Sequence, residues 1–291
     1  MSGSKSTVPF GFRDVEPEEK PALVRGIFSS VASRYDLMND LMSFAVHRLW
    51  KDEFVAWLDP RPGWAVLDVA GGTGDIAMRI DERIRLRQDF GGPGVPHPAP
   101  RSLQRRGVRR RGAPTGAAQP HRRNQTESRE ARSAITVCDV SFAMLTQGMA
   151  RPGAEKLDWL CGDAEQLPIA DASQDAYTIA FGIRNCTHLD RVLKEAHRVL
   201  KPGGRFLCLE FSKLTVPGLD AIYDVYSFSV LPRLGEVVAG DGAAYRYLAE
   251  SIRRFPSQKA FAAAIAEAGF GQVKFRNLSG GIAAMHSGWK L

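Results

Sequence analysis

The sequence predicts an α/β protein built on a doubly wound, mostly parallel sheet. Two observations carry this prediction. Short apolar runs alternate with helical patterns from residue 64 to residue 211, and the first run leads into a glycine-rich turn, "LDVAGGTGD" at 67–75. Repeated strand–helix order favours parallel strands with helices on both faces. Ligands of such sheets bind at the carboxyl ends of the strands.

Each element follows from a local pattern. We expect five strands, at 64–69, 134–139, 157–163, 175–182 and 205–211. Helices are expected from 71 to 85, over 142–150 with Ser141 as N-cap, and over 188–200, ended by Lys-Pro-Gly-Gly. Apolar spacing from Val24 to Tyr35 predicts a helix, so residues 10–60 are expected to form a helical cap. A helix ending at Gly269 and two closing strands complete one domain over 1–291.

A basic segment at 85–133 interrupts this order. It is rich in Gly, Pro, Arg and Ala and has no apolar period, so we expect it to be disordered. Thirteen arginines and three acids lie between Arg83 and Arg132. The net charge of this stretch, 13 − 3 = +10, exceeds the net charge of the whole chain, +7. The rest of the chain is therefore net acidic, and the charge alone predicts no nucleic-acid partner. The segment remains open to interpretation as an RNA- or lipid-binding arm or as a surface insertion without a role.

Cysteine usage and hydropathy bear on the compartment. The four cysteines are scattered singly, so they suggest neither a metal site nor a redox motif. No run resembles a signal peptide, and no apolar run of 18 residues occurs. We expect a cytoplasmic protein with reduced thiols, without excluding peripheral contact at the inner face of the membrane.

The glycine turn admits two interpretations. Gly72-x-Gly74-x-x-Ala77 fits the Rossmann-type dinucleotide fingerprint. The acid directly before it, Asp68, instead suits a donor with an ammonium and a sulfonium, such as S-adenosylmethionine. Asp139 ends the second strand, where a carboxylate accepts ribose hydroxyls in either interpretation. Asp163 ends the third strand and is placed to read an adenine edge, which favours the methyl donor. A turn or N-cap role is the alternative for each acid.

The chain resembles the UbiE family of quinone-biosynthesis C-methyltransferases. The likeness rests on "SVASRYDLMNDLMSFAVHRLWK", "LDVAGGTGD", "GDAEQLP", "AFGIRN", "RVLKPGGRFLCLEFS" and "YRYLAESIRRFP", and covers residues 10–84 and 134–291. It implies a class I methyltransferase fold and donor contacts at Thr73, Asp139, Asp163 and Ala164. A further donor contact, often Ser in the family, falls on Ala180, and Cys186 stands where the family usually has a small aliphatic residue.

The resemblance implies methyl transfer to a ring carbon of a polyprenylated quinol in ubiquinone or menaquinone synthesis. Arg184 is the candidate to stabilise the ring phenolate because its guanidinium stays protonated. Asn185 is a candidate to fix the ring, and Tyr35 to orient it or accept a proton, with Asp36 and Asn39 beside it. Pairing with an acid, helix capping and core packing are the alternatives for Arg184, Asn185 and Tyr35.

Several expectations stay open on the sequence alone. The aromatic run at 222–231 predicts either a prenyl-tail channel or a core helix. The acceptor ring, the general base and the oligomeric state, a homodimer included, are not assigned, and neither is membership of a quinone-biosynthesis complex. Methylation of another small molecule or of RNA on the same fold is the competing enzyme function. A scaffold protein that has lost catalysis is the competing function outside enzymes.

Overall fold

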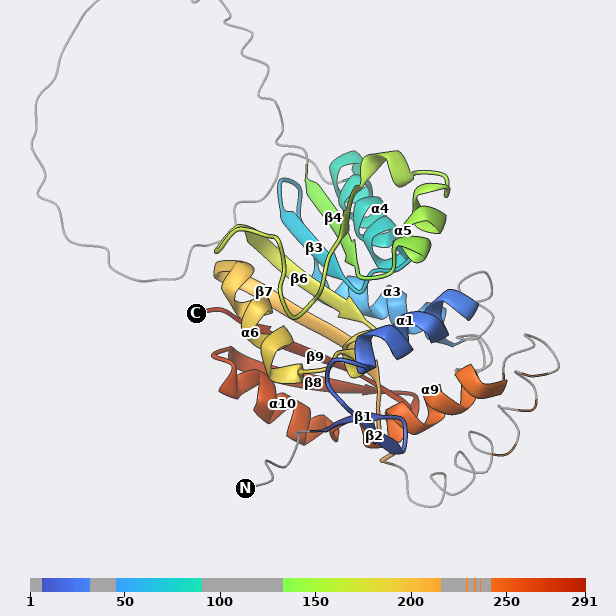
Figure 1. Ribbon diagram of the computed structural model, residues 1–291. Helices are drawn as coiled ribbons and strands as arrows, with labels where there is room; N and C mark the ends of the chain where they lie inside the picture. Colours follow the sequence, from blue (N-terminus) through green and yellow to red (C-terminus); the bar gives the residue numbers. More distant parts are fainter. Residues whose placement is uncertain are drawn as a thin grey trace, which may run out of the picture.

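The computed structural model describes residues 7–31, 46–90, 133–215 and 242–291, together with residues 229, 233 and 236. Its central feature is one sheet of seven strands (Figure 1). The strands are β3 (Ala65–Val69), β4 (Ala134–Asp139), β5 (Asp158–Cys161), β6 (Gln174–Ala180), β7 (Leu200–Phe211), β8 (Gly271–Leu278) and β9 (Ala283–Trp289). Their order in the sheet is β5-β4-β3-β6-β7-β9-β8.

The sheet is mostly parallel, as predicted. The strands from β3 to β7 pair in parallel, and β9 pairs antiparallel with both β7 and β8. The two closing strands therefore form a hairpin whose second strand lies between its first strand and the parallel part. Since the parallel strands share one direction, the carboxyl ends of β3, β4 and β6 meet at one edge of the sheet.

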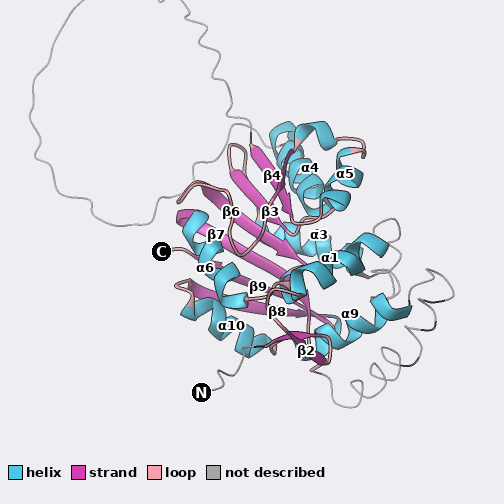
Figure 2. Ribbon diagram, in the orientation of Figure 1, coloured by secondary structure: helices cyan, strands magenta, loops and turns pink. Residues whose placement is uncertain are grey.

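Helices cover both faces of the sheet (Figure 2). They are α1 (Lys20–Val31), α3 (His47–Leu58), α4 (Asp75–Phe90), α5 (Phe142–Met149), α6 (Leu189–Val199), α9 (Gly242–Arg254) and α10 (Gln258–Glu267). Alternate residues of β3 serve different cores: Val66 packs in the core that includes residues of α3 and α4, and Leu67 in the core that includes residues of α6 and α10. Three short 3₁₀ turns at Ala154–Lys156, Ile183–Asn185 and Ser279–Gly281 complete the elements.

The N-terminal cap is only partly helical, which corrects the expectation for residues 10–60. A hairpin of β1 (Val8–Phe10) and β2 (Arg13–Val15) precedes α1, and the Phe10 ring lies 4.5 Å from the Tyr247 ring of α9. Strands of three residues are too short to show an alternating pattern in the sequence. Helix α9 was likewise not predicted from periodicity. Tyr35 and the rest of 32–45 lie outside the described residues, as does most of the aromatic run at 222–231.

Three predicted boundaries were wrong. Helix α4 continues past Arg85 to Phe90, because Arg85 pairs with Asp81 one turn earlier at 3.1 Å and Arg87 donates to the Pro60 carbonyl at 3.1 Å. Residues 85–90 of the expected insertion therefore belong to α4, and its residues 91–132 lie outside the described residues. Strand β5 ends at Cys161 and does not reach Asp163.

Strand β7 also differs from its expected start, because it begins at Leu200 instead of Arg205. The Lys-Pro-Gly-Gly stretch remains in the sheet as an irregular first part. Pairing shifts there from Gln174–Leu200 to Ala176–Arg205, and Gly203 takes a φ of +80°. No helix among the described residues is long and apolar enough to cross a membrane.

Candidate active site

One cavity lies at the carboxyl edge of the parallel strands. Loops that follow β3, β4, β5 and β6 form most of its wall, and α1 of the cap closes it. Figure 1 shows α1 beside the ends of the central strands. Its lining includes six residues that are described below: Gly72, Asp139, Asp163, Ala164, Phe181 and Asn185. The structure thus brings together residues separated by more than 100 positions in the chain.

Asp139 joins the tip of β4 to the glycine turn. Its Oδ2 accepts a hydrogen bond from the Gly72 amide at 2.9 Å, and its Oδ1 accepts one from the Ser141 amide at 2.8 Å. Burial raises the pKa of this carboxyl, and the two amide donors oppose that effect. Each carboxylate oxygen has a second lone pair, so both can still accept a hydroxyl. Asp139 therefore lies where the sequence predicted, facing the cavity.

Asp68 lies deeper than the sequence suggested. Its side chain is fully buried, and its Oδ1 accepts a hydrogen bond at 2.7 Å from Thr178, its neighbour on β6. Its Oδ2 has no hydrogen-bond partner among the described residues. Burial raises the pKa of Asp68 to about 7, because the charged form loses its hydration. A buried carboxyl with an open acceptor is suited to a cationic ligand group.

The glycine turn needs its glycines for two reasons. Gly72 and Gly74 have φ values of +55° and +76°, which L side chains rarely adopt. A Cβ on Gly74 would also lie 2.7 Å from the Trp159 ring of β5. Thr73, between them, is held by Arg151, whose guanidinium donates to the Thr73 hydroxyl at 3.2 Å and to its carbonyl at 3.3 Å. The turn is therefore fixed in shape by packing around it.

Asp163 and Ala164 follow β5 on the rim of the cavity. Asp163 is exposed, and its Oδ1 accepts a hydrogen bond at 2.9 Å from the Glu165 amide two residues later. Asp163 therefore has the turn role that was the alternative to donor binding, and its Oδ2 remains available to a ligand. Ala164 is buried beside it. Both residues line the cavity, as expected for donor contacts.

Arg184 is buried in an ion pair. One guanidinium nitrogen lies 2.6 Å from the Glu210 carboxylate and donates to the Phe181 carbonyl at 2.7 Å. Arg184 therefore pairs with an acid, which was the alternative to its catalytic role. The Glu210 carboxylate neutralises the positive charge that was expected to face a phenolate. The Nε of Arg184 has no partner among the described residues. A direct contact of Arg184 with the substrate therefore stays a prediction.

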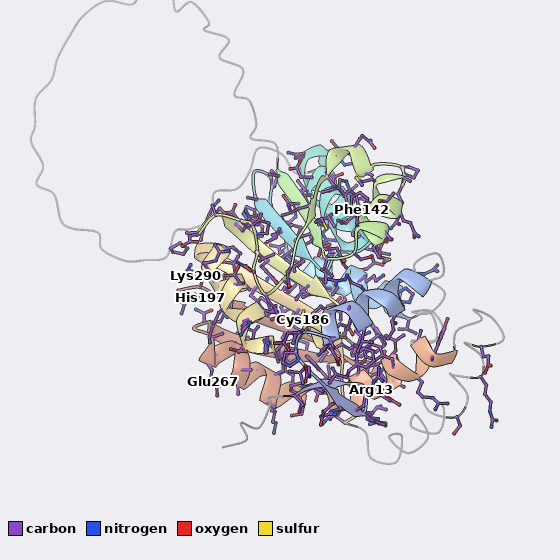
Figure 3. All side chains as sticks on the ribbon, viewed as in Figure 1. Arg13, Phe142, Cys186, His197, Glu267 and Lys290 are labelled. Carbon is purple, nitrogen blue, oxygen red and sulfur yellow. The ribbon has the colours of Figure 1, made fainter. Side chains whose placement is uncertain are left out.

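The rest of this loop is also tied to other elements. We call residues 183–188 the 183–188 loop. The Tyr247 hydroxyl of α9 donates to Asn185 Oδ1 at 3.1 Å. Figure 3 shows Cys186 at the centre of the molecule, and its carbonyl accepts a bond at 2.7 Å from Lys20 of α1. Glu165 accepts from the Thr187 and His188 amides at 2.6 and 2.8 Å.

Sequence reasoning missed these partners. Glu210, Lys20, Glu165 and Tyr247 lie on four different elements or loops, so no local pattern joins them to the 183–188 loop. Burial lowers the pKa of Lys20, although the negative charge of Glu165 opposes that effect. Tyr247 was in view within the quoted run "YRYLAESIRRFP". Its motif pointed to the family and carried no information about Asn185.

Sequence comparison places this geometry in a family. Residues 13–290 match the ubiE/COQ5 methyltransferase family. The chain is 48% identical over 288 residues to the ubiquinone/menaquinone biosynthesis C-methyltransferase UbiE of Brucella anthropi, covering 97% of this chain and 92% of that protein. It is 46% identical over 288 residues to the protein of the same name from Caulobacter sp., covering 99% and 100%. The chain belongs to the ubiE/COQ5 methyltransferase family.

Solved structures agree on the fold. The methyltransferase bound to the Trm112 activator of Haloferax volcanii superposes with a TM-score of 0.54 at 17% identity, over 92% of this chain and 97% of that one. A SAM-dependent methyltransferase of Thermotoga maritima gives 0.53 at 18% identity, over 91% and 99%. Family membership makes the chain a methyltransferase whose methyl donor is S-adenosylmethionine. The open carboxyl of Asp68 and the glycine turn fit that donor.

Proposed function

We propose that this chain methylates a ring carbon of a polyprenylated quinol in ubiquinone or menaquinone synthesis. One observation carries the proposal: a single cavity is lined by Asp139 and Asp163, by Asn185 and by the apolar Val24 of α1. The acids suit the adenosine end of the donor. The amide and the apolar wall suit a ring that bears hydroxyl groups and a hydrocarbon tail.

The reaction requires the protein to orient the two reactants and to stabilise the negative charge of the ring. S-adenosylmethionine supplies a methyl group on a sulfonium. A ring carbon becomes nucleophilic when a neighbouring hydroxyl loses its proton, which is costly because a phenol titrates near pH 10. Asn185 donates to or accepts from the ring hydroxyls, and Arg184 supports Asn185 by anchoring the loop to Glu210. Holding the two reactants in line contributes on the order of 7–11 kcal/mol.

The lipid tail of such a substrate implies contact with a membrane surface. We propose peripheral association of the chain with the membrane surface during substrate capture. A homodimer or a complex with other enzymes of quinone synthesis would serve the same transfer of substrate. Sedimentation of the protein with anionic vesicles, with and without prenylated quinol, tests this association.

Labelled methyl transfer tests the proposed reaction. Purified protein is incubated with methyl-labelled donor and with reduced prenylated benzoquinol or naphthoquinol precursors, and the product is isolated by extraction into solvent. We expect label in at least one quinol. Asp139→Ala should remove transfer, whereas Asp190→Ala, an exposed acid on α6 paired with Lys194 at 3.2 Å, should leave it unchanged. Donor binding without transfer to either ring would contradict the proposed substrate.

A further inference from the structure

A second cavity adjoins the first at the glycine turn. It shares Ala70, Gly72 and Phe181 with the first cavity, so the two are neighbours. Ala70 and Phe181 have φ values of +50° and +57°, a costly backbone conformation for residues other than glycine. Both residues directly follow strands, so this strain lies at two neighbouring strand ends and is consistent with a site held in shape for a ligand.

The charges around this second cavity come from two parts of the molecule. Its walls include Asp68, Thr73 and Asp75 of the sheet and glycine turn, and Lys51 of the cap helix α3. Of the described residues that line it, Lys51 alone carries a positive charge. The Lys51 side chain is 6% exposed, and its ammonium lies 2.8 Å from Asp75 Oδ2. Asp75 opens α4, whose N-terminus also favours negative groups.

Asp75 holds Lys51 in place. Its second oxygen, Oδ1, accepts from Arg79 at 3.2 Å, so each oxygen of Asp75 faces one cation. Burial would raise the pKa of Asp75, but Lys51 and Arg79 outweigh it and keep the pKa below its usual value. An ammonium has three donors, and the pair with Asp75 uses one of them. Lys51 can therefore bind a further anion while Asp75 orients it.

The opposite charge is supplied by Asp68. Its unpaired Oδ2 is fully buried and lies close to the turn, since a Cβ on Gly71 would be 2.8 Å from that oxygen. The cavity thus offers a cation and a carboxylate oxygen to one small ligand group. Among the parts of S-adenosylmethionine, only the amino-acid end carries both an anion and a cation. Asp139 and Asp163, the residues expected to bind the adenosine end, line the first cavity instead.

We propose that Lys51 binds the α-carboxylate of the methyl donor and that Asp68 Oδ2 accepts a hydrogen bond from its α-ammonium. This assignment requires that the chain binds S-adenosylmethionine, and it does not depend on the proposed quinol substrate. It gives the cap a direct part in donor binding, because α3 belongs to the N-terminal segment and not to the sheet. Ala180 lines the same cavity but has no hydroxyl, so its side chain offers the donor no hydrogen bond beside those of Lys51 and Asp68.

The test compares two donors that differ at one group. Calorimetry measures the affinity of the full chain for S-adenosylmethionine and for its decarboxylated form, which keeps the ammonium and the sulfonium. We expect the wild type to prefer the complete donor by about tenfold to 100-fold, the range of a hydrogen bond between charged groups. Lys51→Met should remove most of that preference by weakening only the complete donor.

Arg79→Met is the matched control. Arg79 pairs with the same Asp75 but does not line the cavity, so this variant should keep the preference for the complete donor. Lys51→Arg should retain part of it. Equal weakening of both donors by Lys51→Met, or no weakening, would show that Lys51 only joins α3 to α4. Failure of the wild type to bind either donor would instead overturn the donor assignment itself.

A melting curve guards against loss of fold. If Lys51→Met does not fold, Lys51→Gln replaces it in the same comparison, because it keeps a polar donor without the charge. The ratio of the two affinities is measured within each variant, so a general loss of stability does not change it. A Lys51→Gln ratio equal to that of the wild type would overturn the proposal.

Discussion

The donor-binding residues and the 183–188 loop, the two sides of the site, differ in how their polar groups are occupied. On the donor side, and within the part of the chain that the structure describes, Asp139 is bonded only to backbone amides, and Asp68 keeps one oxygen without a partner. On the other side, every residue from Arg184 to His188 is bonded to another element or loop. The donor side is thus prepared to receive a ligand. The 183–188 loop is held against movement by its neighbours.

This difference predicts opposite consequences of substitution. A substitution of a donor-side acid should alter donor binding and leave stability similar, or even improve it. A change at the partners of the 183–188 loop should reduce stability and turnover together. The most informative variants are those that can violate this division.

The largest effect is expected at the buried pair of Arg184 and Glu210. Glu210→Gln leaves a buried guanidinium without its counter-charge, and breaking such a pair costs about 3–5 kcal/mol. At about 2–4 °C per kcal/mol, the midpoint of thermal unfolding should fall by roughly 10 °C. Differential scanning calorimetry measures this shift.

A double variant separates stability from catalysis. Arg184→Met with Glu210→Gln removes both charges and keeps an acceptor for the Phe211 amide. We expect it to melt above Glu210→Gln alone. Recovery of stability without recovery of turnover would give Arg184 a part in catalysis, whereas recovery of both would make it structural.

Gly74→Ala should have the next largest effect. The new Cβ meets the Trp159 ring at 2.7 Å and imposes a strained φ, so the turn must shift. Overpacking of this kind costs about 1–3 kcal/mol, and we expect donor affinity to fall by about tenfold or more. Gly203→Ala is the control for strain alone, because φ is +80° there and no atom of the described residues lies within 4 Å of a Cβ. Equal loss of donor affinity in both variants would contradict a steric role of Trp159.

Asp68 should make donor binding depend on pH. Its pKa of about 7 means that the carboxyl is largely protonated at pH 6 and becomes ionised as the pH rises. Because the ammonium of the donor favours the ionised form, affinity should rise between pH 6 and pH 7.5 and binding should release a proton. Asp75 and Asp139 face the same region, and their charges add to the raised pKa. Calorimetry in buffers of different ionisation enthalpy counts the proton, and Asp68→Asn should release none.

The same residue should limit stability. A pKa raised in the folded state gives stability that is full below the unfolded value of 3.8 and lost as the pH rises through 7. Asp68→Asn should therefore melt at the wild-type temperature at pH 4 and several degrees higher at pH 8. A lower melting temperature at pH 8 would show that the carboxylate stabilises the fold.

The smallest effect is expected at Tyr247. Tyr247→Phe removes the hydrogen bond to Asn185 and keeps the ring packed on Phe10. A bond of this kind contributes about 1 kcal/mol, so turnover should fall by a few fold while donor affinity is unchanged. Steady-state kinetics and calorimetry on the same preparation check both parts. A loss of donor affinity would show that the two sides of the site are coupled.

The sequence by itself determined the parts of this protein that local patterns encode. The structure confirms the alternation of strands and helices, the glycine turn and the Ser141 cap, all of which depend on neighbours in the chain. The Ser141 hydroxyl accepts a hydrogen bond from the Met144 amide. Asp139 and Asp163 could be found because the segments that follow parallel strands meet at one edge of the sheet. The start of β7 and the end of α4 were misjudged because sheet pairing and ion pairs override turn residues and composition.

Only the tertiary structure decided which side chains meet. The partners of Arg184 and Asp68 lie 26 and 110 positions away, and the Lys51–Asp75 contact joins the cap to the glycine turn. The burial that raises the pKa of Asp68 is also a property of the packed sheet and not of its motif. Contacts between distant segments depend on how whole layers pack, and no spacing along one segment encodes them.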